Sequence, residues 1–251
     1  MPYTATVSLL VRLLYGGFAW FVLLFVVVPV AVACLLLPGL NRRRAVARWG
    51  AATVFKMIGS GIEVRGEPLT EADTAVVVAN HQSYLDGMIL TAVLPPHYTF
   101  LIKGEMARVP IAGFVLSRLG SQFVDRSDAT NRHRSARRLV TAARKGRPLA
   151  VFPEGTFDGT PGLKTFRLGA FRAAWRAGRP VAPVVITGAR QKLPADSWLP
   201  RPGPLTVEFR PEISAGEFSN EVSMMRAVRR AILERLNEPD LDEPDLDEPA
   251  N

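Results

Sequence analysis

The segment Asn80-His-Gln-Ser-Tyr-Leu-Asp86 places a histidine and an aspartate five residues apart, directly after the apolar run 75–79. On a continuous helix this spacing turns through roughly 500°, so the two side chains would lie on different faces. They can meet only if the chain turns between them. Ser83 can cap a helix that has Asp86 at its third position, a capping box with Asp in place of the usual Glu. This pattern predicts a strand-to-helix turn that brings Asp86 back towards His81.

A carboxylate bound to one ring nitrogen of His81 would fix the tautomer and make the other nitrogen a better general base. The alternative is a polar turn in which His81 is merely exposed and Asp86 only stabilises a helix N-terminus. The residues of the turn alone leave both interpretations open. A metal-dependent hydrolase could use the same pair as ligands, but His97 and His133 have no clustered partners in the sequence, so we predict no metal.

Two other segments also place polar residues after apolar runs. VFPEGTF (151–157) ends in Glu154-Gly155-Thr156, a turn whose main-chain N–H groups can meet an anion. KGEMARVPIAG (103–113) follows another expected strand and begins with Lys103. There is no glycine-rich dinucleotide loop and no P-loop lysine pattern.

Strand-like and helix-like segments alternate between residues 60 and 237, which predicts an α/β fold. We expect a mixed, mostly parallel sheet flanked by helices, with ligand sites at the carboxyl ends of strands. The last strand, 205–213, is expected at an edge of the sheet. The expected strands are 62–66, 75–80, 98–103, 121–126, 148–155, 181–188 and 205–213, and the expected helices are 87–94, 114–120, 129–145, 166–179 and 220–237.

The N-terminal residues 1–59 are predicted to form a membrane anchor. Residues 13–40 are 28 consecutive residues without a charge, long enough for a helix to cross a bilayer core of ~30 Å with tilt. Gly16, Gly17 and Pro29 are possible breaks, so re-entry into one leaflet stays open beside a full crossing. A cleaved signal peptide is a third interpretation, which the continuing apolar run disfavours. Residues 44–59 are expected to form an amphipathic basic helix at the membrane interface.

The charge distribution divides the chain again at residue 238. The last 14 residues, EPDLDEPDLDEPAN, hold seven acids and no Lys or Arg, so residues 1–237 carry +15 whereas the whole chain carries +8. We expect 238–251 to be a disordered, solvating tail, with a self-inhibitory contact as the alternative. Arginines follow the apolar segment at once, which places the domain at residues 60–237 on the cytoplasmic face of a membrane. The basic domain suits anionic lipids or substrates; a nucleic-acid partner is not expected, because no binding motif appears.

Several of these segments together resemble the PlsC-type glycerolipid acyltransferases, which include the lysophosphatidate acyltransferases. NHQSYLD, KGEMARVPIAG, Gly120 with Asp125-Arg126, FPEGT and VAPVVI occur in the family's order, over about residues 60–190. The resemblance implies an enzyme in which His81 is the general base and Asp86 orients it. The acceptor hydroxyl would then attack acyl-CoA or acyl-carrier protein directly, without an acyl-enzyme and without a cofactor.

The resemblance also implies roles in substrate binding. Glu154, Gly155 and Thr156 would shape the acceptor site, and Lys103 and Arg126 would supply positive charge to a phosphate. The expected acceptor is a lysophospholipid, most directly 1-acyl-sn-glycerol-3-phosphate.

One residue departs from the family pattern. The family commonly continues Glu-Gly-Thr-Arg, whereas this chain has Phe157, and an apolar ring cannot replace a guanidinium. Lys164 or Arg167 could compensate, or the acceptor is another lysolipid such as a lyso-aminolipid. A membrane-anchored adaptor without catalytic activity is the alternative from another functional class.

Overall fold

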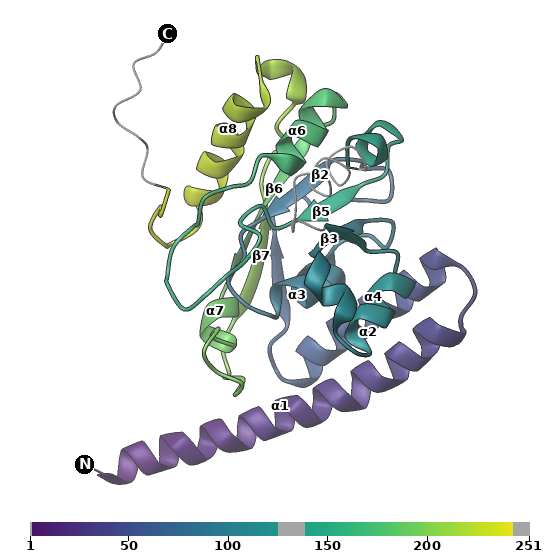
Figure 1. Ribbon diagram of the computed structural model, residues 1–251. Coiled ribbons are helices and arrows are strands. Elements are labelled where there is room, and N and C mark those ends of the chain that lie inside the picture. Colours follow the sequence, from purple (N-terminus) through teal and green to yellow (C-terminus); the bar gives the residue numbers. More distant parts are fainter. Residues whose placement is uncertain (1, 125–138, 243–251) are drawn as a thin grey trace.

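The computed structural model describes residues 2–124 and 139–242, which form a seven-stranded sheet covered by helices (Figure 1). The strand order is β1-β7-β6-β2-β5-β3-β4, and every neighbouring pair is parallel except β6 with β7. The predicted mixed, mostly parallel sheet is confirmed. The strands are β1 (Ile62–Arg65), β2 (Val76–Ala79), β3 (Thr99–Lys103), β4 (Gln122–Val124), β5 (Leu149–Val151), β6 (Val181–Thr187) and β7 (Leu205–Phe209).

The expected edge position of 205–213 is wrong. β7 lies between β6 and β1, and β1 forms the edge with only one partly covered residue, Ile62. The alternating burial of β7 indicates that one face of the strand is covered, but it does not indicate which strands lie on either side. β1 reaches β7 from more than a hundred residues away in the chain, so local sequence could not reveal that pairing.

The helices follow the expected alternation with strands. They are α1 (Pro2–Leu36), α2 (Leu40–Met57), α3 (Asp86–Val93), α4 (Ala112–Arg118), α6 (Gly169–Arg176), α7 (Ala189–Lys192) and α8 (Glu221–Leu233), with 3-10 turns η1 (Gly104–Arg108) and η2 (Ala215–Glu217). Of the basic helix expected at 129–145, residues 139–144 are helical, and 129–138 lie outside the described residues.

The two faces of β2 are covered by different layers because successive side chains of a strand point to opposite sides. Val77 and Ala79 pack in a cluster with α1, α2 and α3, whereas Val76 and Val78 pack in a second cluster with α6 and α8. All four residues are at most 1% exposed. The continuous apolar run therefore marks a central strand of a parallel sheet, and the rigid core around this strand fixes the position of the turn at its carboxyl end.

The N-terminal segment is an antiparallel pair of helices. α1 is continuous through Gly16, Gly17 and Pro29, so the breaks expected there do not occur, and the chain turns instead at 37–39. Gly39 provides the turn with φ of 82°, a left-handed conformation that favours glycine. Residues Leu9–Leu36 of α1 are long and apolar enough to cross a membrane.

α1 nevertheless packs along the domain, which lies to one side of it in Figure 1. In the first half of α1, the hydroxyl of Tyr15 donates to the carbonyl of Ile58 at 3.1 Å. In its middle, Trp20 donates to the carbonyl of Trp198 at 2.7 Å. Near its end, Arg118 donates to the carbonyl of Leu35 at 2.7 Å.

Lys192, which is 1% exposed, strengthens the first of these contacts. Its ammonium group donates to Ser60, to the Tyr15 hydroxyl at 3.4 Å and to the Arg201 carbonyl at 3.2 Å. Burial lowers the pKa of Lys192 to about 8.

Arg44, Arg48 and Lys56 of α2 were expected to meet lipid head groups, but Arg44 and Arg48 bind the protein, whereas Lys56 is exposed. Arg44 is 8% exposed and donates to the carbonyls of Leu119 and His97 at 2.8 and 2.9 Å. Arg48 donates to the Ala92 carbonyl at 3.3 Å. These arginines satisfy loop carbonyls that helix ends and turns leave without partners, and so they fasten α2 to the domain.

Candidate active site

The site begins where β2 ends, at a residue that fixes the direction of the chain. Asn80 is 0% exposed, and its amide pairs with the main chain of Ile186 in both directions. It donates to the Ile186 carbonyl at 2.9 Å and accepts from the Ile186 N–H at 2.7 Å. The end of β2 is thereby fastened to β6, and His81 leaves the sheet from a fixed point.

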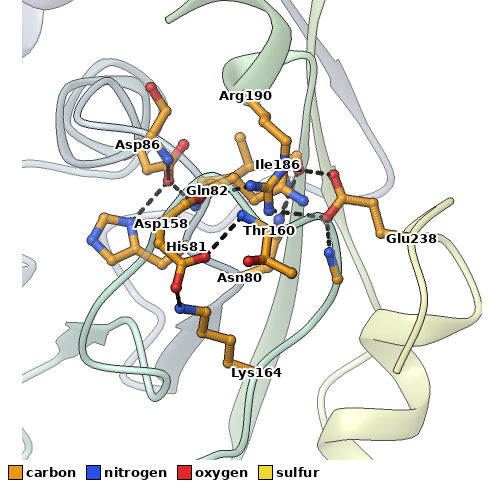
Figure 2. Close-up of polar contacts among 12 residues, drawn as sticks. Asn80, His81, Gln82, Asp86, Asp158, Thr160, Lys164, Ile186, Arg190 and Glu238 are labelled. Carbon is orange, nitrogen blue, oxygen red and sulfur yellow. Dashed lines mark hydrogen bonds and ion pairs between the residues drawn. The ribbon is translucent and has the colours of Figure 1, made fainter. Parts of the chain in front are cut away.

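His81 and Asp86 meet as the sequence predicts. Nδ1 of His81 lies 2.9 Å from Oδ2 of Asp86 (Figure 2). The same oxygen accepts the main-chain N–H groups of Gln82 at 2.6 Å and Ser83 at 2.8 Å. Asp86 is 0% exposed, and three donors converge on one of its oxygens, so the orientation of its carboxyl group is fixed. An imidazole that donates from Nδ1 carries its free lone pair on Nε2, which is the arrangement of a general base.

The predicted role of Ser83 is only partly right. Its hydroxyl accepts the N–H of Leu85 at 3.2 Å and donates to the carbonyl of Leu193 at 2.8 Å. α3 itself begins at Asp86, so Ser83 supports the turn that precedes the helix and does not cap its first turn. Because the hydroxyl proton is used on Leu193 and the residue is 0% exposed, Ser83 is not placed as a nucleophile.

Aromatic rings surround the imidazole. Phe152 stacks on His81 with ring centroids 4.3 Å apart, and Phe157 meets it edge-on at 4.5 Å. Tyr84 packs on Phe157 at 4.7 Å, and Trp198 stacks on Tyr84 at 5.9 Å. Only 19% of the His81 side chain is exposed. The rings hold the imidazole plane and keep most water away, which strengthens the interaction with Asp86.

Glu154 braces the histidine from the other side. One of its carboxylate oxygens accepts the main-chain N–H of His81 at 2.6 Å, and the other accepts that of Lys164 at 2.9 Å. Glu154 follows β5, the neighbour of β2, so two adjacent strand ends are joined through one carboxylate. The side chain is 4% exposed, and burial raises its pKa to about 7 against the two N–H donors that lower it.

The predicted cations Lys164 and Arg167 lie beside a hollow of about 430 Å³. Its wall is formed by Glu154, Lys164, Thr165, Arg167 and Leu241. Lys164 forms an ion pair with Asp158, whereas Arg167 is exposed and donates weakly to the Glu154 carbonyl at 3.5 Å. Glu154 therefore links His81 to a recess lined by Lys164 and Arg167.

The remaining predicted site residues are placed less centrally. Gly155 takes the left-handed φ of 74° that turns the chain after Glu154, and Thr156 is exposed. Lys103 ends β3, pairs with Glu105 at 3.3 Å and stands two strands from β2, about 10 Å across the sheet. Arg126 lies outside the described residues.

The first five residues of the acidic tail are bound to the domain, so the predicted disordered segment starts too early. Glu238 accepts two hydrogen bonds from Arg190, at 3.0 and 3.1 Å, and one from the Gly162 N–H at 2.7 Å (Figure 2). Asp240 pairs with Arg229 and forms a bridge with Leu163. Residues 238–242, here called the strap, therefore hold the loop that carries Lys164; residues 243–251 lie outside the description.

Sequence reasoning missed Asn80, Arg190 and Glu238. Asn80 had a signal, because it is the last polar residue before the histidine at the end of a buried strand. Glu238 had none, because its composition and repeat are those of a solvating tail. Among the described residues, no group of three or more His, Cys, Asp or Glu side chains is arranged to hold a metal ion.

Comparison with known proteins agrees with this geometry. The family model described as Acyltransferase matches residues 61–187. The chain is 33% identical over 152 residues to the lyso-ornithine lipid O-acyltransferase of Pseudomonas aeruginosa, which covers 61% of this chain and 57% of that protein. It is 28% identical over 180 residues to the 1-acyl-sn-glycerol-3-phosphate acyltransferase of Escherichia coli, with 70% and 73% covered.

The chain spans about half to two thirds of the length of the curated relatives from Pseudomonas, Haemophilus influenzae and Saccharomyces cerevisiae, at 57%, 64% and 50%. The crystal structure of the 1-acyl-sn-glycerophosphate acyltransferase PlsC from Thermotoga maritima matches with a TM-score of 0.70 and 23% identity. That match covers 91% of this chain and 96% of the other, and it shows that the two share a fold.

Proposed function

The chain belongs to the Acyltransferase family, and on this premise we propose that it transfers a fatty acyl group from a thioester to the free hydroxyl of a lysophospholipid. The observation that supports this most is the His81–Asp86 pair, braced at the histidine main chain by Glu154. The donor is acyl-CoA or acyl-carrier protein, and the acceptor in the principal proposal is 1-acyl-sn-glycerol-3-phosphate.

The geometry supports a direct transfer. Nε2 of His81 takes the proton of the acceptor hydroxyl while that oxygen attacks the thioester carbonyl. The new C–O bond forms, the C–S bond breaks, and the protonated His81 returns its proton to the leaving thiolate. Asp86 stabilises the imidazolium between the two steps. Cys34 is 0% exposed in α1, so it is not placed to form an acyl-enzyme with the substrates.

Phe157 supports a second acceptor. Its ring lies 4.5 Å from that of His81, where a phosphate would gain nothing from an apolar edge. Of the two cations that could compensate, Lys164 is already paired with Asp158, whereas Arg167 is exposed. A lyso-aminolipid needs less positive charge than a lysophosphatidate, and one relative is named a lyso-ornithine lipid O-acyltransferase.

The membrane is proposed as the place of reaction, with α1 lying in the plane of one leaflet. Its contacts with Ile58, Trp198 and Arg118 fasten the part of α1 from Tyr15 to Leu35 to the domain, so a perpendicular crossing would draw the domain into the hydrocarbon. The opposite side of α1 is an exposed apolar stripe suited to lipid, formed by Leu14, Phe18, Phe21, Phe25, Val28 and Val32. The cytoplasmic face is proposed from the arginines that follow α1.

The test is release of free thiol from acyl-CoA by the purified full chain, with lysophosphatidate and lyso-ornithine lipid as parallel acceptors. We expect His81→Ala to lower the rate by roughly 100- to 10,000-fold, the range for removal of a general base. His97→Ala is the matched control, since that ring pairs with Glu71 and the Asp73 carbonyl away from the site. Transfer that survives His81→Ala would overturn the role proposed for His81, and no transfer to either acceptor would overturn the proposed activity and favour an adaptor.

A further inference from the structure

The segment between β3 and α4 holds the one strained non-glycine residue of the described chain. Ile111 has φ of 63° and ψ of −59°, a γ-turn closed by the Ala112 N–H on the Pro110 carbonyl at 2.6 Å. A β-branched residue is rare at positive φ because its Cβ crowds the backbone. Strain of this kind persists where the surrounding structure enforces it, and it is a reason to ask what the residue does.

The strained turn pushes an apolar side chain into solvent. Ile111 is 77% exposed, and Phe114 beside it is 59% exposed. Met106 and Val109 in the same segment are 37% and 41% exposed. Such a cluster on a protein surface marks a site of contact with another apolar body. We call these four residues the apolar tip.

The apolar tip is a rigid feature. Gly113 is buried against η1, where an added Cβ would come within 2.4 Å of the Ala107 carbonyl oxygen. The Gly113 N–H donates to the Val109 carbonyl at 2.8 Å, and Val115 donates to the Ile111 carbonyl at 2.9 Å. Ile111 is therefore already held outward, so its insertion into another apolar body needs little further ordering of the chain. This favours insertion over packing against the domain.

Charge and position indicate which partner the apolar tip meets. The exposed Arg108 lies within the segment of the tip, a pattern that suits anionic lipid head groups beside an apolar interior. Arg118, the last residue of α4, donates to the Leu35 carbonyl at the end of α1, and α4 contacts α1 (Figure 1). Leu36, next to that contact, is 79% exposed, so the helix that carries the tip meets α1 at a place where α1 is itself apolar and exposed.

We propose that the apolar tip inserts into the same lipid leaflet as α1 and sets the rotation of the domain on the membrane. A helix lying in the interface leaves the domain free to rotate about the helix axis. A second, rigid contact away from that axis removes this freedom. The tip follows β3, whose carboxyl end lies at the same edge of the sheet as those of β2 and β5, where His81 and Glu154 stand. The inserted tip therefore turns the catalytic edge towards the lipid.

The proposal rests on the proposed function for the identity of the substrate, but its first test does not use activity. Cys34, the only cysteine, is replaced by Ser, and Ile111→Cys is labelled with an environment-sensitive fluorophore. The full chain is bound to vesicles of equimolar phosphatidylcholine and phosphatidylglycerol. We expect a blue shift and quenching by brominated acyl chains at position 111. The matched control is Arg226→Cys, an exposed residue of α8 on the far side of the molecule from α1 (Figure 1), and we expect no quenching there.

Equal quenching at both positions, or none at 111 on bound protein, would overturn the proposal. A second variant separates insertion from folding. Ile111→Gly relieves the positive φ, so its melting temperature should equal or exceed that of the wild type. We expect Ile111→Gly with Phe114→Ser to lose about tenfold in transfer to a vesicle-borne acceptor, while transfer to a short-chain monomeric acceptor is unchanged. Equal loss on both acceptors would show that the tip acts inside the site. Absence of transfer by the wild type would reject the proposed function and leave the labelling result to decide the tip.

Discussion

The carboxylate of Glu154 holds both the histidine and the lysine loop, so replacing it should separate activity from stability. In Glu154→Gln, the amide keeps one acceptor for the two N–H groups of His81 and Lys164. The other N–H then faces an NH₂ group in a site where the side chain is 4% exposed. A buried donor left without a partner costs about 1–3 kcal/mol. If His81 is displaced and the whole cost is added to the activation free energy, the rate falls by roughly 5- to 150-fold.

Stability should respond differently because the wild-type carboxyl is buried at a cost. Its pKa rises from 4.5 to about 7 on folding, which corresponds to about 3 kcal/mol at pH well above 7. Between pH 4.5 and pH 7 the Glu154 carboxyl is protonated in the folded state and ionised in the unfolded state. The contribution of Glu154 to the free energy of unfolding is therefore greatest below pH 4.5, falls as the pH rises through 7, and then stays constant. Glu154→Gln has no such component.

In Glu154→Gln the lost hydrogen bond lowers the stability, and removal of the buried charge raises it. The two effects oppose each other at pH 8, and the second becomes smaller as the pH falls. At pH 8 the relief of the buried charge offsets the lost hydrogen bond, so urea unfolding should find the variant within about 2 kcal/mol of the wild type while its rate is low. At pH 5.5 the folded carboxyl is protonated while the unfolded one is still ionised, so less than half of the cost of burial remains, and the variant should lose about 2 kcal/mol relative to the wild type between pH 8 and pH 5.5. Full activity at pH 8, or a stability difference that does not move against the variant as the pH falls, would refute this reasoning.

Two further perturbations concern the acceptor side of the site. Truncation after Asn237 removes the strap from Arg190 and Leu241 from the hollow, so KM for the acceptor should rise about tenfold with kcat unchanged, as expected for loss of charge-assisted hydrogen bonds. The matched control is truncation after Asp242, which keeps the strap. Equal kinetics of the two truncated proteins would show that the strap does not contribute to acceptor binding. Phe157→Arg adds a guanidinium beside His81, and the ratio of kcat/KM for lysophosphatidate to that for lyso-ornithine lipid should rise about tenfold. An unchanged ratio would show that position 157 does not contact the part of the acceptor that differs.

The turn at His81 could be predicted because its determinants are local. An apolar run of strand length, a turn of polar residues and an aspartate at the right distance specify strand, turn and helix in one segment of the chain. The meeting of His81 and Asp86 follows from that geometry and is confirmed at 2.9 Å. The order of strands and helices, and hence the α/β class, follows from the same kind of local pattern.

The features that could not be predicted depend on partners distant in the chain. Whether β7 is an edge strand is decided by β1, and whether Arg44 meets lipid or protein is decided by carbonyls more than fifty residues away. The strap shows the same limit most clearly. The composition of EPDLD argues for a solvated chain, but one copy finds Arg190 and the Gly162 N–H, which satisfy its first carboxylate at once.

His81, the proposed general base, is held by two different carboxylates acting on two different parts of it. Asp86 holds the ring through Nδ1, and Glu154 holds the main chain through the N–H. Asp86 lies within the turn that it organises, whereas Glu154 also reaches the loop at Lys164, which the strap fastens from outside. In the proposed mechanism, proton removal is thus built into one short segment, while acceptor recognition depends on a loop assembled from distant parts of the chain. On this proposal a change such as Phe157 alters the acceptor without disturbing the base.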